Sequence, residues 1–383
     1  MEVMIYMTEK CNMVCKYCYE GLNKTDNMLN EETLFKTIEY ISSIASGSEI
    51  HFTFLGGEPL LNKEILIKAV ELIEEKFLDY KITYSITTNA TLLDHKIVDF
   101  LYRHHFQVSI SIDGDEFTHN INRIAKNGKN LYSVVMVNLK YLLKTNKPFS
   151  VRMTIDTNNV RFLSKNISYF LELGVKSIFM SINYLGNWKE KDLKILNEQL
   201  DLCDRIYIEQ VSKTDDKIIN FYDFKIGMFI AERKTQYCSA GSKNHFVVKS
   251  DGAIYPCSYV TYNDEWNIGN VTVGTNMSKL CSVIKKHVEK EAKCKECSIA
   301  FTCVGARCGY LNYSMNQKMN YPSFKICEIE KIVYEHNFHV IRELLIQKNR
   351  RVWGIYKYCI NNNINISSLF RNMLLEEKII QNQ

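Results

Sequence analysis

The chain has 383 residues, 46% apolar and 24% charged, with a formal net charge of +5. This is a globular composition, and the length favours a catalytic domain of about 200 residues with one or two smaller units. We find no apolar run long enough to span a membrane, and Met1 leads into a strand-like stretch without signal-peptide features. We therefore expect a cytoplasmic protein without a membrane partner. Because the charge is scattered, we also expect no nucleic-acid partner.

Six short apolar runs alternate with longer amphipathic stretches over residues 1–212. Helical patterns such as 30–46, 63–78 and 159–173 separate the runs. This alternation is typical of βα units around a parallel sheet. Right-handed crossovers would curl six units into an α/β fold, a partial (β/α)6 TIM-like barrel. The expected strands are Val3–Thr8, Ile50–Leu55, Ile82–Thr88, Gln107–Ile112, Phe149–Ile155 and Ser177–Ile182.

The rest of the chain has a different character. A helical pattern over about 189–213 ends the alternation, and 213–236 is expected to be a connector. Residues 237–327 are rich in Cys and Gly with few long helical patterns, which indicates a domain built around metal. The C-terminal segment 328–383 is expected to be helical, beginning with an amphipathic helix over 328–347.

Three of the thirteen cysteines, Cys11, Cys15 and Cys18, stand directly behind the first expected strand. Without a secretion signal, thirteen cysteines indicate metal binding rather than a disulfide framework. A 4Fe-4S cluster has four irons, so a loop with three thiolates leaves one iron open to a ligand that is not protein. A structural zinc site is the alternative, but it needs four ligands and no fourth lies nearby.

Further motifs follow the next three expected strands, so all lie at one edge of the predicted sheet. They are Gly56-Gly57-Glu58-Pro59, Thr88-Asn89-Ala90 and Ser111-Ile112-Asp113-Gly114. A Gly-Gly pair followed by Pro is, on its own, an ordinary turn. Together with the cysteine loop and its aromatic Tyr17, however, these motifs resemble the radical S-adenosylmethionine (SAM) superfamily.

The resemblance implies a SAM site. In this superfamily, the amine and carboxylate of SAM bind the open iron, and reduction splits SAM into methionine and a 5′-deoxyadenosyl radical that abstracts hydrogen from the substrate. The Gly-Gly-Glu-Pro motif would hold the methionine amino group, Ser111 and Asp113 the ribose or carboxylate, and Arg123 a carboxylate. The implied cofactor-binding residues are Tyr17, Gly56, Gly57, Glu58, Pro59, Asn89, Ser111, Asp113 and Arg123.

Each of these assignments has a structural alternative. Asp113-Gly114 is a common turn pair, Arg123 has the character of a solvated surface cation, and Ser111 is equally suited to face a helix. Ala90 also departs from the Thr-Asn-Gly pattern that the superfamily often has after the third strand. The catalytic acid or base is not readable.

A second set of cysteines resembles the SPASM domain, which carries two auxiliary 4Fe-4S clusters. The set is Cys238, Cys257, Cys294, Cys297, Cys303, Cys308 and Cys327. The resemblance implies that Cys294, Cys297, Cys303 and Cys327 hold one cluster. It assigns Cys238, Cys257 and Cys308 to the other, whose fourth ligand is not readable. Two structural zinc sites are the alternative.

Two further points concern the cysteines. Four residues separate Cys303 from Cys308, where the SPASM pattern has three, and this affects the assignment of Cys308. The remaining Cys203, Cys281 and Cys359 lie in apolar or helical stretches, so we expect them in the core, where a lone cysteine behaves as a small hydrophobe.

The resemblance therefore predicts three 4Fe-4S clusters, SAM and a radical oxidoreductase. The leading hypothesis is a maturase that forms a thioether or other cross-link in a Cys-containing ribosomal peptide. The alternatives are an anaerobic sulfatase-maturing enzyme, which makes formylglycine, and a small-molecule dehydrogenase. A non-enzymatic iron-sulfur relay or zinc scaffold would explain the cysteines but not the motifs at the sheet edge.

One residue position separates the first two hypotheses. Sulfatase-maturing enzymes carry an aspartate next to an auxiliary-cluster cysteine as general base, whereas Ser258 and Tyr259 follow Cys257 here. The expected partners are a peptide or small-protein substrate and a ferredoxin or flavodoxin as electron donor. The chain begins at the first strand, so leader recognition by a separate binding protein is a further possibility.

Overall fold

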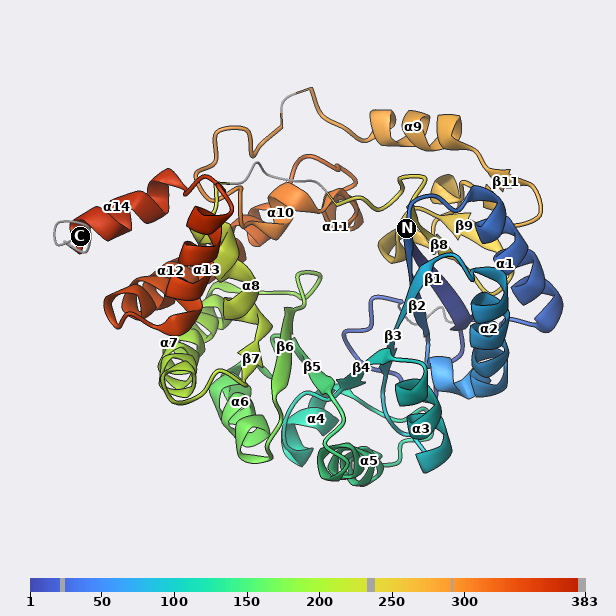
Figure 1. Cartoon of the computed structure of the whole chain (residues 1–383), viewed down its shortest axis with the longest axis horizontal. Helices are drawn as coiled ribbons and strands as arrows, with labels where there is room; N and C mark the ends of the chain where they lie inside the picture. Colours follow the sequence, from blue (N-terminus) through green and yellow to red (C-terminus); the bar gives the residue numbers. More distant parts are fainter. Residues whose placement is uncertain (21–24, 233–237, 291, 378–383) are drawn as a thin grey trace. The chain divides into compact units, whose positions relative to one another are not determined.

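The computed structural model describes residues 1–20, 25–232, 238–290 and 292–377 (Figure 1). These residues form two compact units. The first contains residues 1–112, 119–151 and 239–288, and the second contains 113–118, 152–238 and 289–383, apart from the segments outside the described ranges. We describe each unit separately.

The first unit is built on a sheet whose strand order is β11-β10-β9-β8-β1-β2-β3-β4 (Figure 1). Strands β8, β1, β2, β3 and β4 are parallel to their neighbours, and β9, β10 and β11 continue antiparallel from β8. Their bounds are β1 Glu2–Thr8, β2 Glu49–Gly56, β3 Lys81–Thr88, β4 Phe106–Ser111, β8 His245–Val248, β9 Ala253–Tyr255, β10 Gly269–Asn270 and β11 Gly274–Thr275.

Helices cover the strands of this unit, and aromatic side chains of the strands form part of its core. Phe54 of β2 is fully buried, and its ring stacks on Tyr84 of β3 and on Phe106 of β4, with centroids 6.1 and 5.8 Å away. Asn30 and Asp94 cap two of the helices by accepting backbone N–H groups. The helices are α1 Glu31–Ile44, η1 Pro59–Asn62, α2 Lys63–Lys76, α3 His95–Arg103, α5 Tyr132–Lys144, η3 Ser258–Val260, η4 Asp264–Trp266 and α9 Met277–Lys286.

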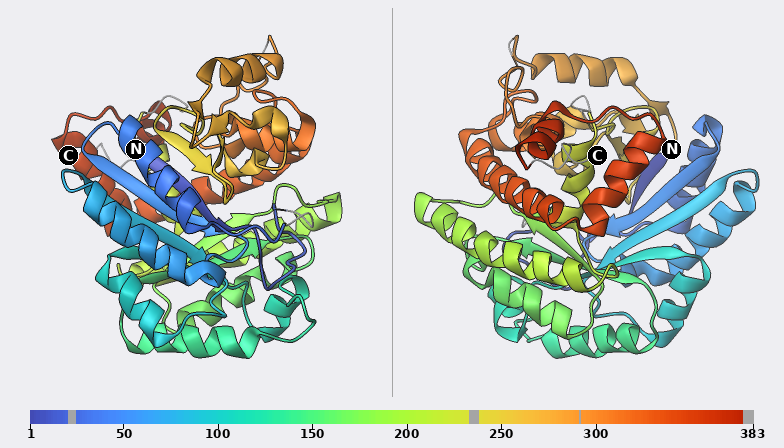
Figure 2. Two further views of the ribbon diagram at one scale, coloured as in Figure 1. Left: turned by 90° about the vertical axis from the view of Figure 1, so that its right-hand side faces the viewer. Right: turned by 60° about the vertical axis from the view of Figure 1, so that its left-hand side comes forward.

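In the second unit, β6 (Ser177–Ile182) pairs in parallel with β7 (Ile218–Ile219), and the remaining elements are mostly helical. Strand β5 (Phe149–Ile155) and helix α4 (Glu116–Asn122) each have residues in both units. The long helices α7 and α12 pack side by side (Figure 2). The helices are η2 Val160–Phe162, α6 Leu163–Glu172, α7 Glu190–Lys213, α8 Asn220–Ile230, α10 Val304–Arg307, α11 Gly309–Asn316, α12 Phe324–Ile346, α13 Arg350–Asn361 and α14 Ser368–Glu376.

All six expected strands are present, each within one residue of its expected start and end. Two features differ from the sequence-based expectation. The connector 213–236 contains a further short strand, β7, and the helix α8. Residues 239–288 join the first unit because β8 pairs with β1, so the two units divide the chain differently from the expected ranges 1–212, 213–236, 237–327 and 328–383. In the described part of the chain, no helix is long and apolar enough to cross a membrane.

The aromatic core of the first unit makes a stability prediction. Phe54→Ala should lower the free energy of unfolding by about 3–5 kcal/mol, because it leaves a cavity between two stacked rings. Phe35→Ala on α1 is the control, since its side chain is 56% exposed and its loss should change stability little. Urea denaturation followed by circular dichroism compares them, and equal shifts would contradict this account of the core.

Candidate functional site

The loop that carries Cys11, Cys15 and Cys18 follows β1 and is fixed by backbone hydrogen bonds. Val14 N donates to Ile124 O at 2.7 Å, and Lys16 N donates to Asn122 O at 2.9 Å. Lys126 N returns a bond of 2.9 Å to Asn12 O. Cys11 is buried, whereas Cys15 and Cys18 are half-buried. The segment after α4 therefore holds the loop in one conformation, which a site with three ligands requires.

Gly56 and Gly57 bring the end of β2 against the start of this loop. A Cβ atom on Gly56 would lie 2.0 Å from Thr8 O, and one on Gly57 would lie 2.2 Å from Lys10 O. Gly56 also has a φ of +139°, which other residues rarely adopt. The Gly57 and Glu58 N–H groups donate to Thr8 O and Lys10 O at 3.0 and 2.9 Å. The glycine pair is therefore needed to seat the cysteine loop.

Glu58 connects the glycine pair to the end of β3. Its carboxylate is buried and accepts from Thr88 Oγ1 at 2.6 Å, Asn89 N at 2.7 Å and Leu60 N at 3.1 Å. Burial raises the pKa of Glu58, and these donors oppose the rise. Asn89 Nδ2 in turn donates to Asn12 Oδ1 in the cysteine loop at 2.8 Å. Three of the predicted motifs are therefore one hydrogen-bonded structure.

Arg123 is buried, with 8% of its surface exposed, so its alternative as a solvated surface cation is wrong. Its guanidinium lies over the ring of Tyr17 in the cysteine loop, 5.4 Å from the centroid. The nearby His119 is also buried, and this burial together with Arg123 lowers the pKa of His119 to about 3. His119 is therefore neutral at pH 7, and the positive charge beside Tyr17 belongs to Arg123.

Ser111 and Asp113 lie at the end of β4. Ser111 is half-buried and belongs to the first unit. Asp113 belongs to the second unit, is fully buried, and accepts a hydrogen bond of 3.0 Å from Thr154 N. Part of the Asp113 carboxylate is therefore used within the fold. That these residues contact SAM stays a prediction.

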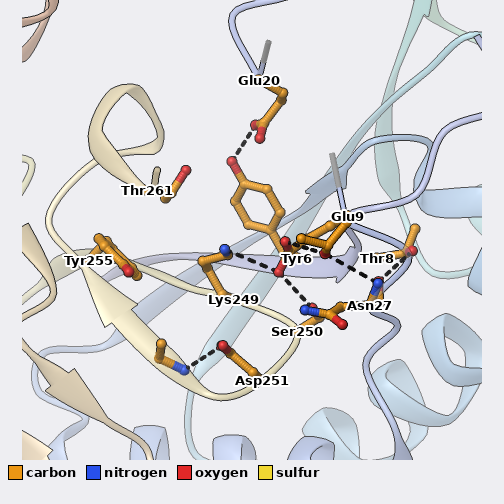
Figure 3. Close-up of polar contacts among 12 residues, drawn as sticks. Tyr6, Thr8, Glu9, Glu20, Asn27, Lys249, Ser250, Asp251, Tyr255 and Thr261 are labelled. Carbon is orange, nitrogen blue, oxygen red and sulfur yellow. Dashed lines mark hydrogen bonds and ion pairs between the residues drawn. The ribbon is translucent and has the colours of Figure 1, made fainter. Parts of the chain in front are cut away.

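Polar contacts that sequence reasoning missed connect the start of the cysteine loop to the turn between β8 and β9 (Figure 3). The buried carboxylate of Glu9 pairs with Lys249 Nζ at 3.2 Å and accepts from Ser250 Oγ at 3.0 Å. Tyr6 of β1 is fully buried and donates its hydroxyl to Glu20, two residues after Cys18. Glu9 and Ser250 are 241 residues apart in sequence, so no local pattern could have indicated the partners of Glu9.

The segments behind Cys18 and Cys257 also meet. The rings of Tyr19 and Tyr259 have centroids 5.7 Å apart. The Thr261 side chain lies beside the Tyr6 hydroxyl in Figure 3 and opposes the rise in the pKa of Tyr6, which burial dominates. Two cysteine-bearing segments that are far apart in sequence are therefore packed together within the first unit.

The second unit gathers the four cysteines predicted to hold one auxiliary cluster. The Cys294 thiol is close enough to Cys327 and Cys297 for their charges to add to the rise in its pKa, which burial dominates. Cys303 is buried and interacts with Cys294 in the same way. Backbone N–H groups of Ala306 and Gly305 donate to the Cys303 sulfur. Four neighbouring thiols, one of them with backbone donors, fit an iron-sulfur cluster.

The cysteine sulfurs can be compared with the spacing that a single zinc ion needs. Tetrahedral zinc, with Zn–S bonds of about 2.3 Å, needs sulfurs about 3.8 Å apart. Within the described ranges, no three cysteine sulfurs lie within 4.8 Å of one another, whereas ligand atoms of Asp201, Asp204 and His336 do. In that group, His336 Nδ1 and Asp204 Oδ2 share a hydrogen bond of 2.6 Å. The described cysteine sulfurs are therefore not gathered as closely as the ligands of a single zinc ion.

The other predicted auxiliary ligands are divided between the units. Cys238 and Cys308 belong to the second unit, and their thiols interact electrostatically. Cys238 N also donates to Arg307 O at 2.9 Å. Cys257 belongs to the first unit. The joint assignment of these three cysteines to one cluster stays a prediction.

The remaining cysteines are placed partly as expected. Cys203 and Cys359 are buried. The expectation for Cys281 was wrong, because this residue is exposed on α9. The buried face of α9 is formed by Leu280 and Val283, so the helix turns Cys281 away from the core.

Comparisons with known proteins identify the family. The model of the radical SAM superfamily matches residues 5–161. An uncharacterized protein of Methanocaldococcus jannaschii is 31% identical over 255 residues, which cover 67% of this chain and 84% of that protein. The chain belongs to the radical SAM superfamily. The expected radical SAM enzyme class, with its 4Fe-4S cluster and SAM, is confirmed.

A named enzyme and a solved structure also resemble most of the chain. A cysteine-type anaerobic sulfatase-maturating enzyme of Clostridium perfringens is 27% identical over 355 residues, covering 86% of this chain and 93% of that protein. The solved structure of native anSMEcpe with bound AdoMet and Cp18Cys peptide matches with a TM-score of 0.74 and 24% identity, covering 89% and 98% of the two chains. The predicted α/β fold of the radical SAM type is confirmed.

The glycine pair gives a test of the site. Gly57→Ala should displace the cysteine loop, because the new Cβ would collide with Lys10 O. If the chain holds three clusters, reconstituted protein should lose about a third of its iron and the ability to cleave SAM. Gly354→Ala on α13 is the control, since its added Cβ meets no atom within 4 Å. Iron analysis and release of 5′-deoxyadenosine measure both, and normal values for Gly57→Ala would refute this role.

Proposed function

We propose that this radical SAM enzyme oxidises a side chain of a peptide or small protein, as anaerobic sulfatase-maturating enzymes do. The observation that carries the proposal is the similarity to such an enzyme over 86% of the chain. The related structure with a bound peptide supports a substrate of this class. The comparisons thus favour the sulfatase-maturing alternative over the leading hypothesis of peptide cross-linking.

The proposal assigns the cysteines to three 4Fe-4S clusters. Cys11, Cys15 and Cys18 hold the cluster that binds SAM, on the loop seated by Gly56 and Gly57. One auxiliary cluster is held by Cys294, Cys297, Cys303 and Cys327, and the other by Cys238, Cys257 and Cys308. Support comes from the mutual interactions of the thiols and from the N–H donors around Cys303.

When bound, the cluster and SAM supply a radical that removes one hydrogen atom from the substrate. The chain's own residues keep the reacting groups in place. Asn12, Asn89 and Glu58 fix the cysteine loop to the ends of β2 and β3. Arg123 places a buried positive charge beside Tyr17, where a carboxylate of SAM can be bound.

For a cysteine substrate, loss of a Cβ hydrogen must be followed by loss of one electron and the thiol proton. This gives a thioaldehyde, which water converts into the aldehyde of formylglycine and hydrogen sulfide. The reaction therefore needs a proton acceptor and an electron acceptor. In sulfatase-maturing enzymes, the resemblance implies an aspartate that accepts the proton next to the cysteine matching Cys257. This chain has Ser258 at that position.

This departure favours a second candidate function. Cross-linking of a Cys-containing ribosomal peptide replaces two hydrogens by one new bond and leaves no aldehyde. The substitution of Ser258 for the expected aspartate is the specific observation that supports it. A ferredoxin or flavodoxin as electron donor, a separate leader-binding protein and a cytoplasmic location remain part of the proposal.

The test uses reconstituted enzyme, a chemical reductant, SAM and a peptide with a single cysteine. We expect 5′-deoxyadenosine release and an aldehyde at the cysteine position, detected by mass spectrometry and by reaction with a hydrazine. The matched peptide with serine in place of cysteine reports whether the enzyme is cysteine-type. Cys15→Ser is the control, because it removes a ligand of the open cluster and should abolish both signals.

The other outcomes separate the remaining functions. Loss of two hydrogens with the thiol blocked to alkylation would support cross-linking instead. Steady 5′-deoxyadenosine release with both peptides unchanged would contradict a peptide substrate of this kind and favour a small molecule.

A further inference from the structure

A half-buried lysine and a buried glutamate hold the peptide groups on either side of Cys303. Lys225 Nζ of α8 donates to Thr302 O at 2.5 Å. Glu330 Oε2 of α12 accepts from Val304 N at 2.9 Å. The Lys225 ammonium and the Glu330 carboxylate are themselves 3.8 Å apart. The Lys225–Glu330 ion pair therefore fixes the backbone on both sides of Cys303.

The pair is enclosed in the second unit. The side chain of Glu330 is 2% exposed and that of Lys225 is 18% exposed. Tyr184 donates its hydroxyl to Glu330 Oε1, so both carboxylate oxygens are hydrogen-bonded. A buried ion pair usually adds little to the stability of the folded protein, because desolvation of both charges offsets most of their attraction. Its position around Cys303 calls for another explanation.

Glu330 is also connected to a second predicted ligand. Cys327 and Glu330 are three residues apart on α12, so both lie on the same face of that helix. Tyr184 comes from the loop after β6, at the carboxyl end of the strand, where barrels of this type place their chemistry. The network therefore joins two cluster cysteines to the functional end of a barrel strand.

We propose that Lys225, Glu330 and Tyr184 are positioning residues for the auxiliary cluster of Cys294, Cys297, Cys303 and Cys327, and that the ion pair sets its reduction potential. The inference rests on the auxiliary cluster of the proposed function. Reduction adds negative charge to the cluster. The ammonium of Lys225 stabilises that charge, and the carboxylate of Glu330 opposes it.

The opposite signs give a sharp test in the full-length reconstituted enzyme. Lys225→Met should lower the reduction potential of this cluster, and Glu330→Gln should raise it, because Gln keeps the acceptor for Val304 N and removes only the charge. Tyr184→Phe should lower it slightly, because the Glu330 carboxylate loses a hydrogen bond that offsets part of its negative charge. Lys331→Met, which removes an exposed charge from the same helix, should leave the potential unchanged.

Potentiometry followed by electron paramagnetic resonance measures these shifts. The cluster of Cys11, Cys15 and Cys18, called the radical cluster below, is the one whose signal changes when SAM is added. Its reduction potential therefore serves as an internal reference. Glu330→Ala, which removes charge and acceptor, should reduce iron by about a third by releasing this cluster. If Glu330→Ala fails to fold, Glu330→Gln and Lys225→Met still decide.

The proposal would be overturned if Lys225→Met and Glu330→Gln shifted the potential in the same direction or not at all. An equal shift in Lys331→Met would overturn it too, and each of these results would leave the proposed function intact. Iron in the wild-type protein that accounts for the radical cluster alone would overturn the auxiliary-cluster assignment itself, and this inference with it. Peptide oxidation is scored separately, so its failure beside the expected shifts would reject only the proposed function.

Discussion

The contact between the end of β2 and the cysteine loop depends on two residues without side chains. Gly56 and Gly57 lie so close to the carbonyls of Thr8 and Lys10 that any Cβ would overlap them. This close approach allows the N–H groups of Gly57 and Glu58 to bond to the loop, and it places the Glu58 carboxylate under the end of β3. The loop geometry, the position of Asn89 and the contact with Asn12 all follow from it.

The first unit also explains how the cysteine loop is related to a segment far along the chain. Because β8 pairs with β1, the strands after Ser239 extend the N-terminal sheet rather than forming a sheet of their own. The ion pair of Glu9 with Lys249 and the ring contact of Tyr19 with Tyr259 then join the two cysteine-bearing segments. The two segments are therefore held together by direct side-chain contacts as well as by the pairing of β8 with β1.

The sequence was most informative where the signal is local. Strands β1 to β6 were predicted to within one residue of each end, because β-branched runs and amphipathic helices alternate regularly. The grouping of Cys11, Asn89 and Glu58 followed from their places at the ends of parallel strands. The assignment of Cys281 to the core failed because the chain pattern did not show which face of α9 is buried.

Contacts between distant residues could not be predicted in the same way. The pairing of β8 with β1, the partner of Glu9 and the ion pair around Cys303 each depend on residues from 77 to more than 200 positions apart. Such pairs carry no periodic signature, and a lone Lys or Glu in a helical stretch is equally consistent with a solvated face. Their discovery required the three-dimensional arrangement of each unit.

The cysteine site of the second unit has an internal conflict that a metal would resolve. Burial raises the pKa of Cys294 and Cys308, and burial together with Glu330 raises that of Cys303 to about 12, so these thiols favour the protonated form. Yet the backbone N–H groups that face Cys303 and Cys308 stabilise negative sulfur. Buried sulfur surrounded by donors is favourable only when a bound cation offsets the cost of desolvation. The surroundings of these cysteines therefore suit thiolates bound to metal better than free thiols.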